Sequence, residues 1–413
     1  LNARTLRDEN TSISVRLKRI NDNGCIRSVT PATFTDDTYA KLIAEFPSLT
    51  NPNLRNKDPV HSTKHHIITV GPPVHCRARP LPPDKYNAAK AEFSRMVKES
   101  ICRPSKSPYS SALHMVPKAN REWRTCGDYR RLNAVTTPDR YNIPNLRDFT
   151  NNLHDCKIFS KIDLLKAYNQ IDVAEDSIPK TAIATPFGLF EFCKMPYGLR
   201  NAAQTFQRFM NEIFSDLDFI FVYVDDLLIA SKTEEEHLEH VRIVFERLQQ
   251  YGILINEAKC EFGKPTLEYL GHTVTNTGIS PLPSKVNAIT EFPKPTTQKQ
   301  LRRFLGSVNF YHRFLRNCAE TLAPMNALLK PKKRGYSTNV EWNPQADAAF
   351  DEIKTRLANA TELQYPEPSA KISLAVDASN EAVGAVLQQT TAAGETTPLS
   401  FFSKKLSNTQ SRY

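Results

Sequence analysis

Apolar side chains recur at intervals of three and four residues in five stretches of this chain, which predicts five amphipathic helices. The stretches lie at about residues 86–101, 201–217, 233–252, 297–315 and 344–357. Three of them begin with a polar residue that is followed three positions later by Gln or Glu, the pattern of a helix cap. The pairs are Asn201 with Gln204, Thr233 with Glu236, and Thr297 with Gln300.

Other stretches have the pattern of strands or of no regular element. Residues 219–230 are an apolar run with two adjacent aspartates near its middle, which predicts a strand, a carboxylate-bearing turn and a second strand. Residues 371–389 and 398–406 also predict strands. Residues 1–60 are polar and weakly periodic, so we expect a linker or domain remnant there. The globular pattern begins near Val70.

Length and charge narrow the class of protein. The chain has 413 residues, 54 Lys and Arg, 44 Asp and Glu, and a formal net charge of +10. That length gives room for about three domains. The positive excess fits either a well-solvated surface or a partner with a phosphate backbone, and charge alone does not choose between them. The sequence has no apolar run of membrane-spanning length. The polar N-terminus lacks Met, so we expect no signal peptide and a start inside a larger translation product.

The cysteines do not form a recognisable framework. All eight are scattered, and none forms a C-x-x-C pair. This argues against a zinc ribbon or a disulfide scaffold and favours a reducing compartment. His61, His65, His66 and Cys76 lie near one another in the sequence, but their spacing fits no zinc site. We interpret them as loop and strand residues.

The candidate chemistry rests on carboxylates. Asp225 and Asp226 lie between two apolar strand halves, where unpaired charges are costly unless they face water or a metal. Asp163 ends another apolar strand upstream. Two divalent cations about 4 Å apart, held by carboxylates from two chain segments, can activate a 3′-hydroxyl and stabilise a leaving pyrophosphate. The alternative is a solvated hairpin turn and an ordinary strand-end aspartate.

Seven motifs in a fixed order identify a family. They are Trp123–Asn133, Phe159–Tyr168, Thr185–Gly188, Met195–Asn201, Thr205–Arg208, Tyr223–Asp226 and Tyr269–His272. In this order the chain resembles the polymerase of gypsy-type long-terminal-repeat retrotransposons, which is related to retroviral reverse transcriptases. Two positions depart mildly from that family, which usually has Phe at Tyr197 and often Pro at Ala203.

The resemblance implies a metal site. Asp163, Asp225 and Asp226 match the catalytic aspartates of the palm, with Asp163 and Asp225 as the main ligands and Asp226 as a supporting one. The implied cofactor is two Mg²⁺ ions, with Mn²⁺ as a substitute. Magnesium suits oxygen ligands that are completed by water and substrate phosphates.

Other site residues are also implied by the resemblance. Lys118 and Arg124 match the fingers cations that bind the incoming triphosphate, although each alone would be an ordinary exposed charge. Tyr168 matches the aromatic gate that excludes a 2′-hydroxyl, and Tyr197 belongs to the loop near the nascent base pair. The primer grip matches Tyr269, Leu270 and Gly271, for which the alternative is a plain strand and turn.

The C-terminal half resembles the later parts of the same polyprotein. The helix at residues 297–315 falls where the family has its thumb. Its neighbouring arginines face either a duplex backbone or solvent: Arg302, Arg303, Arg313 and Arg316. Leu374–Ser379 resembles the first ribonuclease H strand, and Asp377 matches its first catalytic aspartate. The remaining carboxylates of that family have no counterpart up to Tyr413, so we expect ribonuclease H activity only in the full-length polyprotein.

The sequence therefore predicts an α+β right-hand polymerase with fingers, palm and thumb, followed by a connection and a truncated ribonuclease H-like α/β piece. The expected boundaries are 1–69 for a linker after an absent protease, 70–275 for fingers and palm, 276–365 for thumb and connection, and 366–413 for the ribonuclease H-like part.

The implied activity is RNA-directed DNA polymerisation. The implied partners are an RNA template, a DNA template and primer, and deoxynucleoside triphosphates, with no membrane. The resemblance also implies a cytoplasmic location in virus-like particles, with nuclear entry as an option. The oligomeric state stays open.

Two alternatives to this function also stay open. One is an RNA-dependent RNA polymerase, against which Tyr168 argues. The other is a nucleic-acid-binding relic without activity, against which the complete set of motif carboxylates argues.

Overall fold

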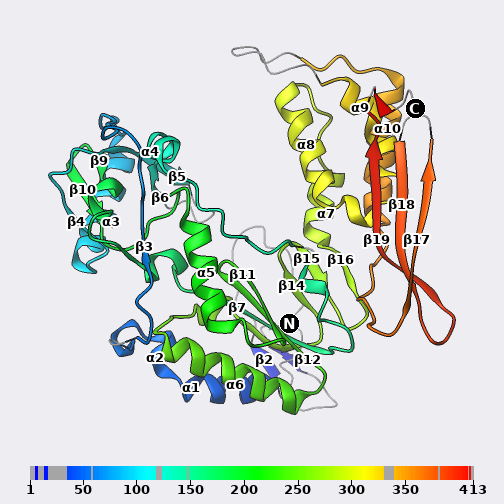
Figure 1. Ribbon diagram of the computed structural model, residues 1–413, viewed down its shortest axis with the longest axis horizontal. Helices are drawn as coiled ribbons and strands as arrows, with labels where there is room; N and C mark the ends of the chain where they lie inside the picture. The colour runs from blue at the N-terminus through cyan, green and yellow to red at the C-terminus, as the bar shows by residue number, and fades with distance from the viewer. Residues whose placement is uncertain are drawn as a thin grey trace.

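The computed structural model describes residues 5–7, 14–16, 35–56, 59–117, 123–146, 148–329, 339–379, 382–407 and 409–410. Two lobes rise from a common base (Figure 1). One lobe carries a five-stranded sheet, and the other carries the helices and the last sheet of the C-terminal third. The base contains a four-stranded antiparallel sheet. No helix in the described ranges is long and apolar enough to cross a membrane.

The base sheet is buried on both of its faces. Its strands run in the order β11-β12-β7-β13, all antiparallel. Along β12, Leu227 and Ile229 enter one hydrophobic core, and the alternate residues Leu228 and Ala230 enter the other. Burial on both faces explains why this segment is an almost continuous apolar run. The strands are β7 (Ile158–Asp163), β11 (Ile220–Tyr223), β12 (Asp226–Ser231) and β13 (Glu261–Lys264).

Two of the predicted helices, α5 (Ala202–Phe214) and α6 (Glu234–Gln250), pack in the first core. The Thr233 hydroxyl caps α6 by accepting a hydrogen bond from the Glu236 N–H at 3.2 Å, which confirms the predicted start. The predicted cap of α5 is wrong. The Asn201 side chain does not cap the helix. Its amide instead donates to the Thr137 carbonyl at 2.8 Å.

The five-stranded sheet of the first lobe runs in the order β4-β10-β9-β5-β6. The predicted helix near residues 86–101 is α3 (Pro83–Lys98), and Ala89, Phe93 and Met96 form its buried face. A short helix, α4 (Arg130–Val135), follows β6. The strands are β4 (Cys102–Pro104), β5 (Ser111–Pro117), β6 (Trp123–Asp128), β9 (Ile183–Thr185) and β10 (Gly188–Phe192). Nearby, β3 (Lys64–His65) pairs in parallel with β8 (Asp172–Val173).

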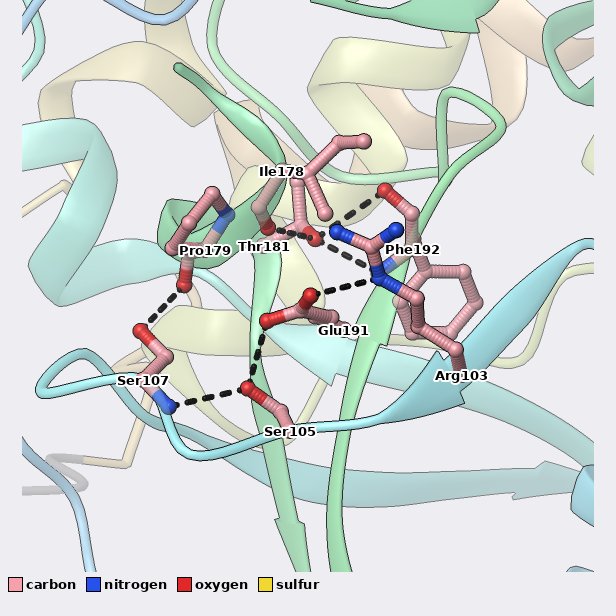
Figure 2. Close-up of polar contacts among 8 residues, drawn as sticks. All are labelled: Arg103, Ser105, Ser107, Ile178, Pro179, Thr181, Glu191 and Phe192. Atoms are coloured by element: carbon pink, nitrogen blue, oxygen red, sulfur yellow. Dashed lines mark hydrogen bonds and ion pairs between the residues drawn. The ribbon is translucent and has the colours of Figure 1, made fainter. Parts of the chain in front are cut away.

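A network of hydrogen bonds joins β10 to the neighbouring segments (Figure 2). The buried Glu191 accepts hydrogen bonds from Arg103 at 2.8 Å and from the Ser105 hydroxyl at 2.6 Å. The Thr181 hydroxyl accepts from the Phe192 N–H at 2.7 Å, where β10 ends. These bonds satisfy buried polar groups on both sides of the strand. They hold the start of the loop that leads to Tyr197.

Residues 35–56 do not behave as the predicted linker. They form α1 (Thr35–Ala44) and α2 (Pro47–Thr50), and both pack against the base. The buried side chains of this segment are Tyr39, Leu42, Ile43, Phe46 and Leu49. The first four stand at spacings of three and four residues, which is a helical stripe. The surrounding polar residues masked this short pattern in the sequence.

The second lobe begins with a three-stranded antiparallel sheet of β14 (Leu267–Tyr269), β15 (His272–Val274) and β16 (Ile279–Pro281). Four helices follow: α7 (Pro283–Thr290), α8 (Gln298–Phe310), α9 (Cys318–Ala327) and α10 (Pro344–Ala358). The last sheet has the order β17-β18-β19. Its strands are β17 (Lys371–Ala378), β18 (Ala382–Thr390) and β19 (Thr396–Lys405), as predicted for this part of the chain. Two short strands near the N-terminus, β1 (Thr5–Arg7) and β2 (Ser14–Arg16), pair with each other.

The predicted helix at residues 297–315 is shorter than expected. Its capping box of Thr297 and Gln300 is present, but α8 ends at Phe310 and a 3-10 helix (His312–Phe314) follows. Because of this change in direction, Arg313 is buried, with its guanidinium over the Phe314 ring. The expectation that Arg313 faces a duplex or solvent is therefore wrong.

Candidate active site

The base sheet brings the three predicted aspartates together. Asp163 ends β7 and Asp226 begins β12, and these two residues are direct partners in the antiparallel register. Directly opposed residues in such a pair project their side chains to the same face. Asp225 lies in the turn that joins β11 to β12, next to Asp226. The three positions therefore converge although they come from two distant segments.

The carboxylates repel one another and lose part of their hydration. Burial raises the pKa of the Asp226 carboxyl, and the nearby charges of Asp225 and Asp163 raise it further. Burial also raises the pKa of Asp225, with an added contribution from Asp163. The Lys259 ammonium lies 3.4 Å from both carboxylate oxygens of Asp163. The site therefore carries excess negative charge that attracts cations.

The donor set fits a hard divalent cation by its chemistry. Within the described ranges, no three His, Cys, Asp or Glu side chains are grouped closely enough to hold a metal ion by themselves. Magnesium, however, uses one or two protein carboxylates and completes its shell with water and substrate phosphates. Asp163, Asp225 and Asp226 supply such carboxylates, and a bound cation would relieve the repulsion that raises the pKa of Asp225 and of Asp226.

The turn that carries Asp225 has an unusual backbone. Val224 has a φ of +55°, in the left-handed region that β-branched residues rarely adopt. Two buried side chains bond the backbone around it. The Gln207 carbonyl accepts from the Val224 N–H at 2.7 Å, and the Tyr269 hydroxyl donates to the Asp226 carbonyl at 2.9 Å. The turn is thus held from α5 on one side and from β14 on the other.

The predicted aromatic residues lie beside the turn. The Tyr168 ring is 5.1 Å from the Tyr197 ring and 5.5 Å from the Phe206 ring, between centroids. Burial raises the pKa of Tyr168 to about 12, and the charge of Asp225 contributes. The pKa of Tyr197 is also raised, mainly by burial and then by Asp225. Both phenols are therefore close enough to the carboxylates for the negative charge of Asp225 to raise their pKa values.

Arg124 and Tyr197 line one cavity between α3 and the five-stranded sheet, together with Lys166. The charge of Arg124 opposes the increase in the pKa of Tyr197 that burial and Asp225 cause, so the two side chains are near each other. The structure thus brings one of the two predicted fingers cations to the site. Lys118, the other one, lies outside the described residues.

The predicted primer-grip residues form the turn between β14 and β15. Tyr269 is fully buried, so its ring is part of the core. Leu270 and Gly271 both have positive φ, +46° and +81°. The Tyr311 hydroxyl donates to the Gly271 carbonyl at 2.7 Å, which joins this turn to the end of α8. Contact with a primer at Leu270 and Gly271 stays a prediction.

Asp377 lies apart from these residues. It is exposed on β17, opposite Gly384 in β18. With Glu320 and Ser403 it lines a small cavity between the last sheet and α9. Its assignment to ribonuclease H chemistry stays a prediction.

Two residues at the site, Gln207 and Lys259, could not be assigned a role from the sequence. Gln207 lies inside the motif Thr205–Arg208, but nothing in the pattern showed that its amide reaches the Val224 backbone. Lys259 lies 96 residues from its partner Asp163 and follows no motif. Contacts of this kind depend on how distant segments pack, which spacing along the chain does not reveal.

Comparisons with known proteins agree with this geometry. Residues 116–274 match the family described as reverse transcriptase (RNA-dependent DNA polymerase), and residues 342–413 match the RNase H-like domain found in reverse transcriptase. The Retrovirus-related Pol polyprotein from transposon 297 of Drosophila melanogaster is 38% identical over 362 residues, 85% of this chain and 33% of that protein. The Transposon Tf2-3 polyprotein of Schizosaccharomyces pombe is 34% identical over 339 residues, 82% of this chain and 25% of that protein.

Solved structures share the fold. A foamy viral protease-reverse transcriptase in complex with RNA/DNA hybrid matches with a TM-score of 0.81 at 22% identity, covering 92% of this chain and 51% of that one. A foamy viral protease-reverse transcriptase dRH in complex with double-stranded DNA matches with a TM-score of 0.80 at 20% identity, covering 97% of this chain and 75% of that one. The predicted α+β polymerase fold with an RNase H-like part is thereby confirmed. The chain spans about a third or less of the two transposon polyproteins.

The ordered motifs, the convergent aspartates and these matches lead to one assignment: residues 116–274 form a domain of the reverse transcriptase family, and residues 342–413 form an RNase H-like domain of the kind found in reverse transcriptases.

Proposed function

We propose that this chain extends a primer 3′-end with deoxynucleoside monophosphates on an RNA or DNA template and releases pyrophosphate. The observation that carries the proposal is the register of the base sheet, in which Asp226 is the direct cross-strand partner of Asp163 while Asp225 lies in the adjoining turn. This register brings the backbone positions of the three aspartates to one edge of the sheet, which supports a site for phosphoryl transfer.

Each side chain has a role in the proposed reaction. Asp163, Asp225 and Asp226 would hold Mg²⁺, with Mn²⁺ as a substitute. The bound ions would promote deprotonation of the primer hydroxyl and neutralise charge on the leaving pyrophosphate. Arg124, with Lys118, would bind the triphosphate, because phosphoryl transfer depends mainly on positioning and charge neutralisation.

The proposed partners follow from the fold and the charge. The related foamy viral protein was solved with an RNA/DNA hybrid and with double-stranded DNA. For this chain we propose the same two classes of duplex, whose phosphates suit a net charge of +10. Ribonuclease H activity at Asp377 is proposed only for the full-length polyprotein.

Primer extension on poly(rA)/oligo(dT) with Mg²⁺ or Mn²⁺ tests the polymerase proposal. The wild-type chain should extend the primer, and Asp225→Asn should not, because the substitution removes a negative charge and a metal ligand. Gel-resolved products over time provide the measurement. Equal extension by the two proteins would reject the catalytic assignment.

Tyr168 tests the choice of sugar. Its ring packs against Tyr197 and lies near Asp225, where a ribose 2′-hydroxyl would meet it. We predict that Tyr168→Ala increases ribonucleotide incorporation relative to deoxynucleotide incorporation, measured as a ratio of kcat/KM values. A wild-type enzyme that prefers ribonucleotides would instead favour an RNA-dependent RNA polymerase.

A further inference from the structure

Gln207 is the buried residue most directly bonded to the turn that carries Asp225. It lies on α5 and is completely buried. Its side-chain carbonyl accepts from the Val224 N–H at 2.7 Å, and its amide nitrogen donates to the Val222 carbonyl at 3.1 Å. This one side chain therefore bonds the backbone of both Val222 and Val224, which directly precede Tyr223 and Asp225 in the hairpin.

The orientation of this amide is determined by its partners. A backbone N–H can only donate and a backbone carbonyl can only accept, so the Gln207 oxygen must face Val224 and its nitrogen must face Val222. The same nitrogen donates to the side-chain Oδ1 of Asn211 at 2.8 Å, and the side-chain amide of Asn211 donates to the Tyr141 hydroxyl at 2.7 Å. Three groups therefore bond the Gln207 amide directly, and Tyr141 orients one of them, the Asn211 side chain.

The left-handed backbone conformation of Val224 depends on support from its surroundings. Val224 has a φ of +55°, and a β-branched residue in this region persists only where its surroundings enforce it. Val224 is itself buried. A buried N–H that loses its acceptor is costly, so the Gln207 oxygen favours the left-handed conformation over alternatives that turn this N–H away.

We propose that Gln207 is a positioning residue that holds Val224 in the left-handed conformation and thereby sets the place of the Asp225 carboxylate relative to Asp163. The inference rests on the proposed function and deepens it. Tyr269 donates a hydrogen bond to the Asp226 carbonyl, so the turn is supported from both α5 and β14, while Asp225 itself remains exposed.

The test compares Gln207→Met with a matched control. Methionine keeps the length of the side chain but cannot serve both backbone partners. The control is Gln298→Met on α8, where a buried glutamine donates to the Leu328 carbonyl at 2.8 Å, away from the aspartates. Both variants lose a buried side-chain amide, so their Tm values should decrease by similar amounts. Gln207→Glu is the second variant, because it keeps the acceptor but loses the donor.

Two readouts separate positioning from stability. In primer extension, Gln207→Met should lower kcat by about tenfold to a hundredfold, the usual result of a small displacement at a reacting centre, with the KM for primer-template unchanged. In electron paramagnetic resonance titrations without substrate, it should weaken Mn²⁺ binding, as we also expect of Asp225→Asn. Gln298→Met should resemble the wild type in both.

The role of Gln207 is overturned if Gln207→Met and Gln207→Glu, both folded, match Gln298→Met in kcat and Mn²⁺ affinity. Because Gln207→Glu keeps the acceptor for the Val224 N–H, this variant should retain kcat and Mn²⁺ affinity near the wild-type values. The role is also overturned if Gln207→Glu, folded, loses both as far as Asp225→Asn does. Failure of the proposed function has a different signature: no protein extends a primer, the wild type included. The Mn²⁺ titration then still decides whether Gln207 positions the turn.

Discussion

At the scale of single residues, the positions of the aspartates lower the stability of the folded chain. Asp226 is half-buried, and burial together with the charges of Asp225 and Asp163 raises its pKa. Its ionised form therefore destabilises the folded chain at neutral pH. A raised pKa means that the folded state takes up a proton more readily than the unfolded state. The penalty is present above the folded pKa and disappears as the pH falls through it.

Asp226→Asn should consequently stabilise the metal-free protein. We predict a rise in Tm at pH 7.5 of at most about 2–4 °C, the shift that about 1 kcal/mol produces in a domain of about 150–250 residues, because solvent screens a half-buried charge. The gain should vanish in acid, below the ordinary carboxyl range, because the wild-type side chain is then neutral as well. Thermal unfolding in EDTA at both pH values is the measurement. An equal gain at both would indicate a packing effect instead of a charge effect.

At the scale of elements, the helices and strands that could be predicted from the sequence are those with long and regular hydrophobic patterns. The helix α6 was predicted because its cap, its apolar stripe and Gly252 agree, and Gly252 has the positive φ that favours glycine at a helix end. The palm hairpin was predicted because its apolar run is broken only by acidic turn residues. The helix α5 starts where it was predicted, but its cap was misjudged, because the Asn201 side chain bonds the Thr137 carbonyl and the Asp139 N–H instead of its own helix.

The missed element, α1, should contribute to the stability of the base. Leu42 is 4% exposed, whereas Leu54, shortly after it, is 54% exposed. We predict that Leu42→Ala lowers the free energy of unfolding by roughly 2–5 kcal/mol, as core leucines do. Leu54→Ala, which removes the same atoms from a hydrated position, should change it by less than about 0.5 kcal/mol.

Urea unfolding followed by circular dichroism measures both variants. Similar losses in the two would mean that α1 does not dock on the base in solution. In that case the interpretation of this segment as a linker would return.

At the scale of the whole molecule, two hydrophobic cores meet at the base sheet. One core includes α1, α3, α5 and α6, and the other includes β14 to β16 and the helices α7 to α10. Because alternate residues of β12 enter different cores, the sheet mechanically connects the two lobes. The net charge of +10 is a property at this same scale, since it acts over the surface that both lobes present.

Binding to primer-template should depend strongly on salt. Arg303 and Arg316 are exposed on and just after α8. We predict that replacing both with alanine reduces the slope of log Kd against log salt by up to about two, since each lost phosphate contact removes about 0.9. Fluorescence anisotropy with a labelled duplex measures the slope. The double variant Lys371→Ala and Lys404→Ala, which removes the same charge from the last sheet, is the control.

If the two double variants change the slope equally, the effect is one of net charge and α8 has no special contact with the duplex.

The direct pairing of Asp163 with Asp226 has a consequence for how this gene tolerates change. Neighbouring positions of a strand point to opposite faces, so a single codon inserted or deleted within β7 or β12 would swing one acidic group to the wrong side. The same indel in a surface loop between these strands would leave their pairing intact. Among naturally occurring copies, frame-preserving length variation should therefore be absent from these two strands in active elements and tolerated only in surface loops between them.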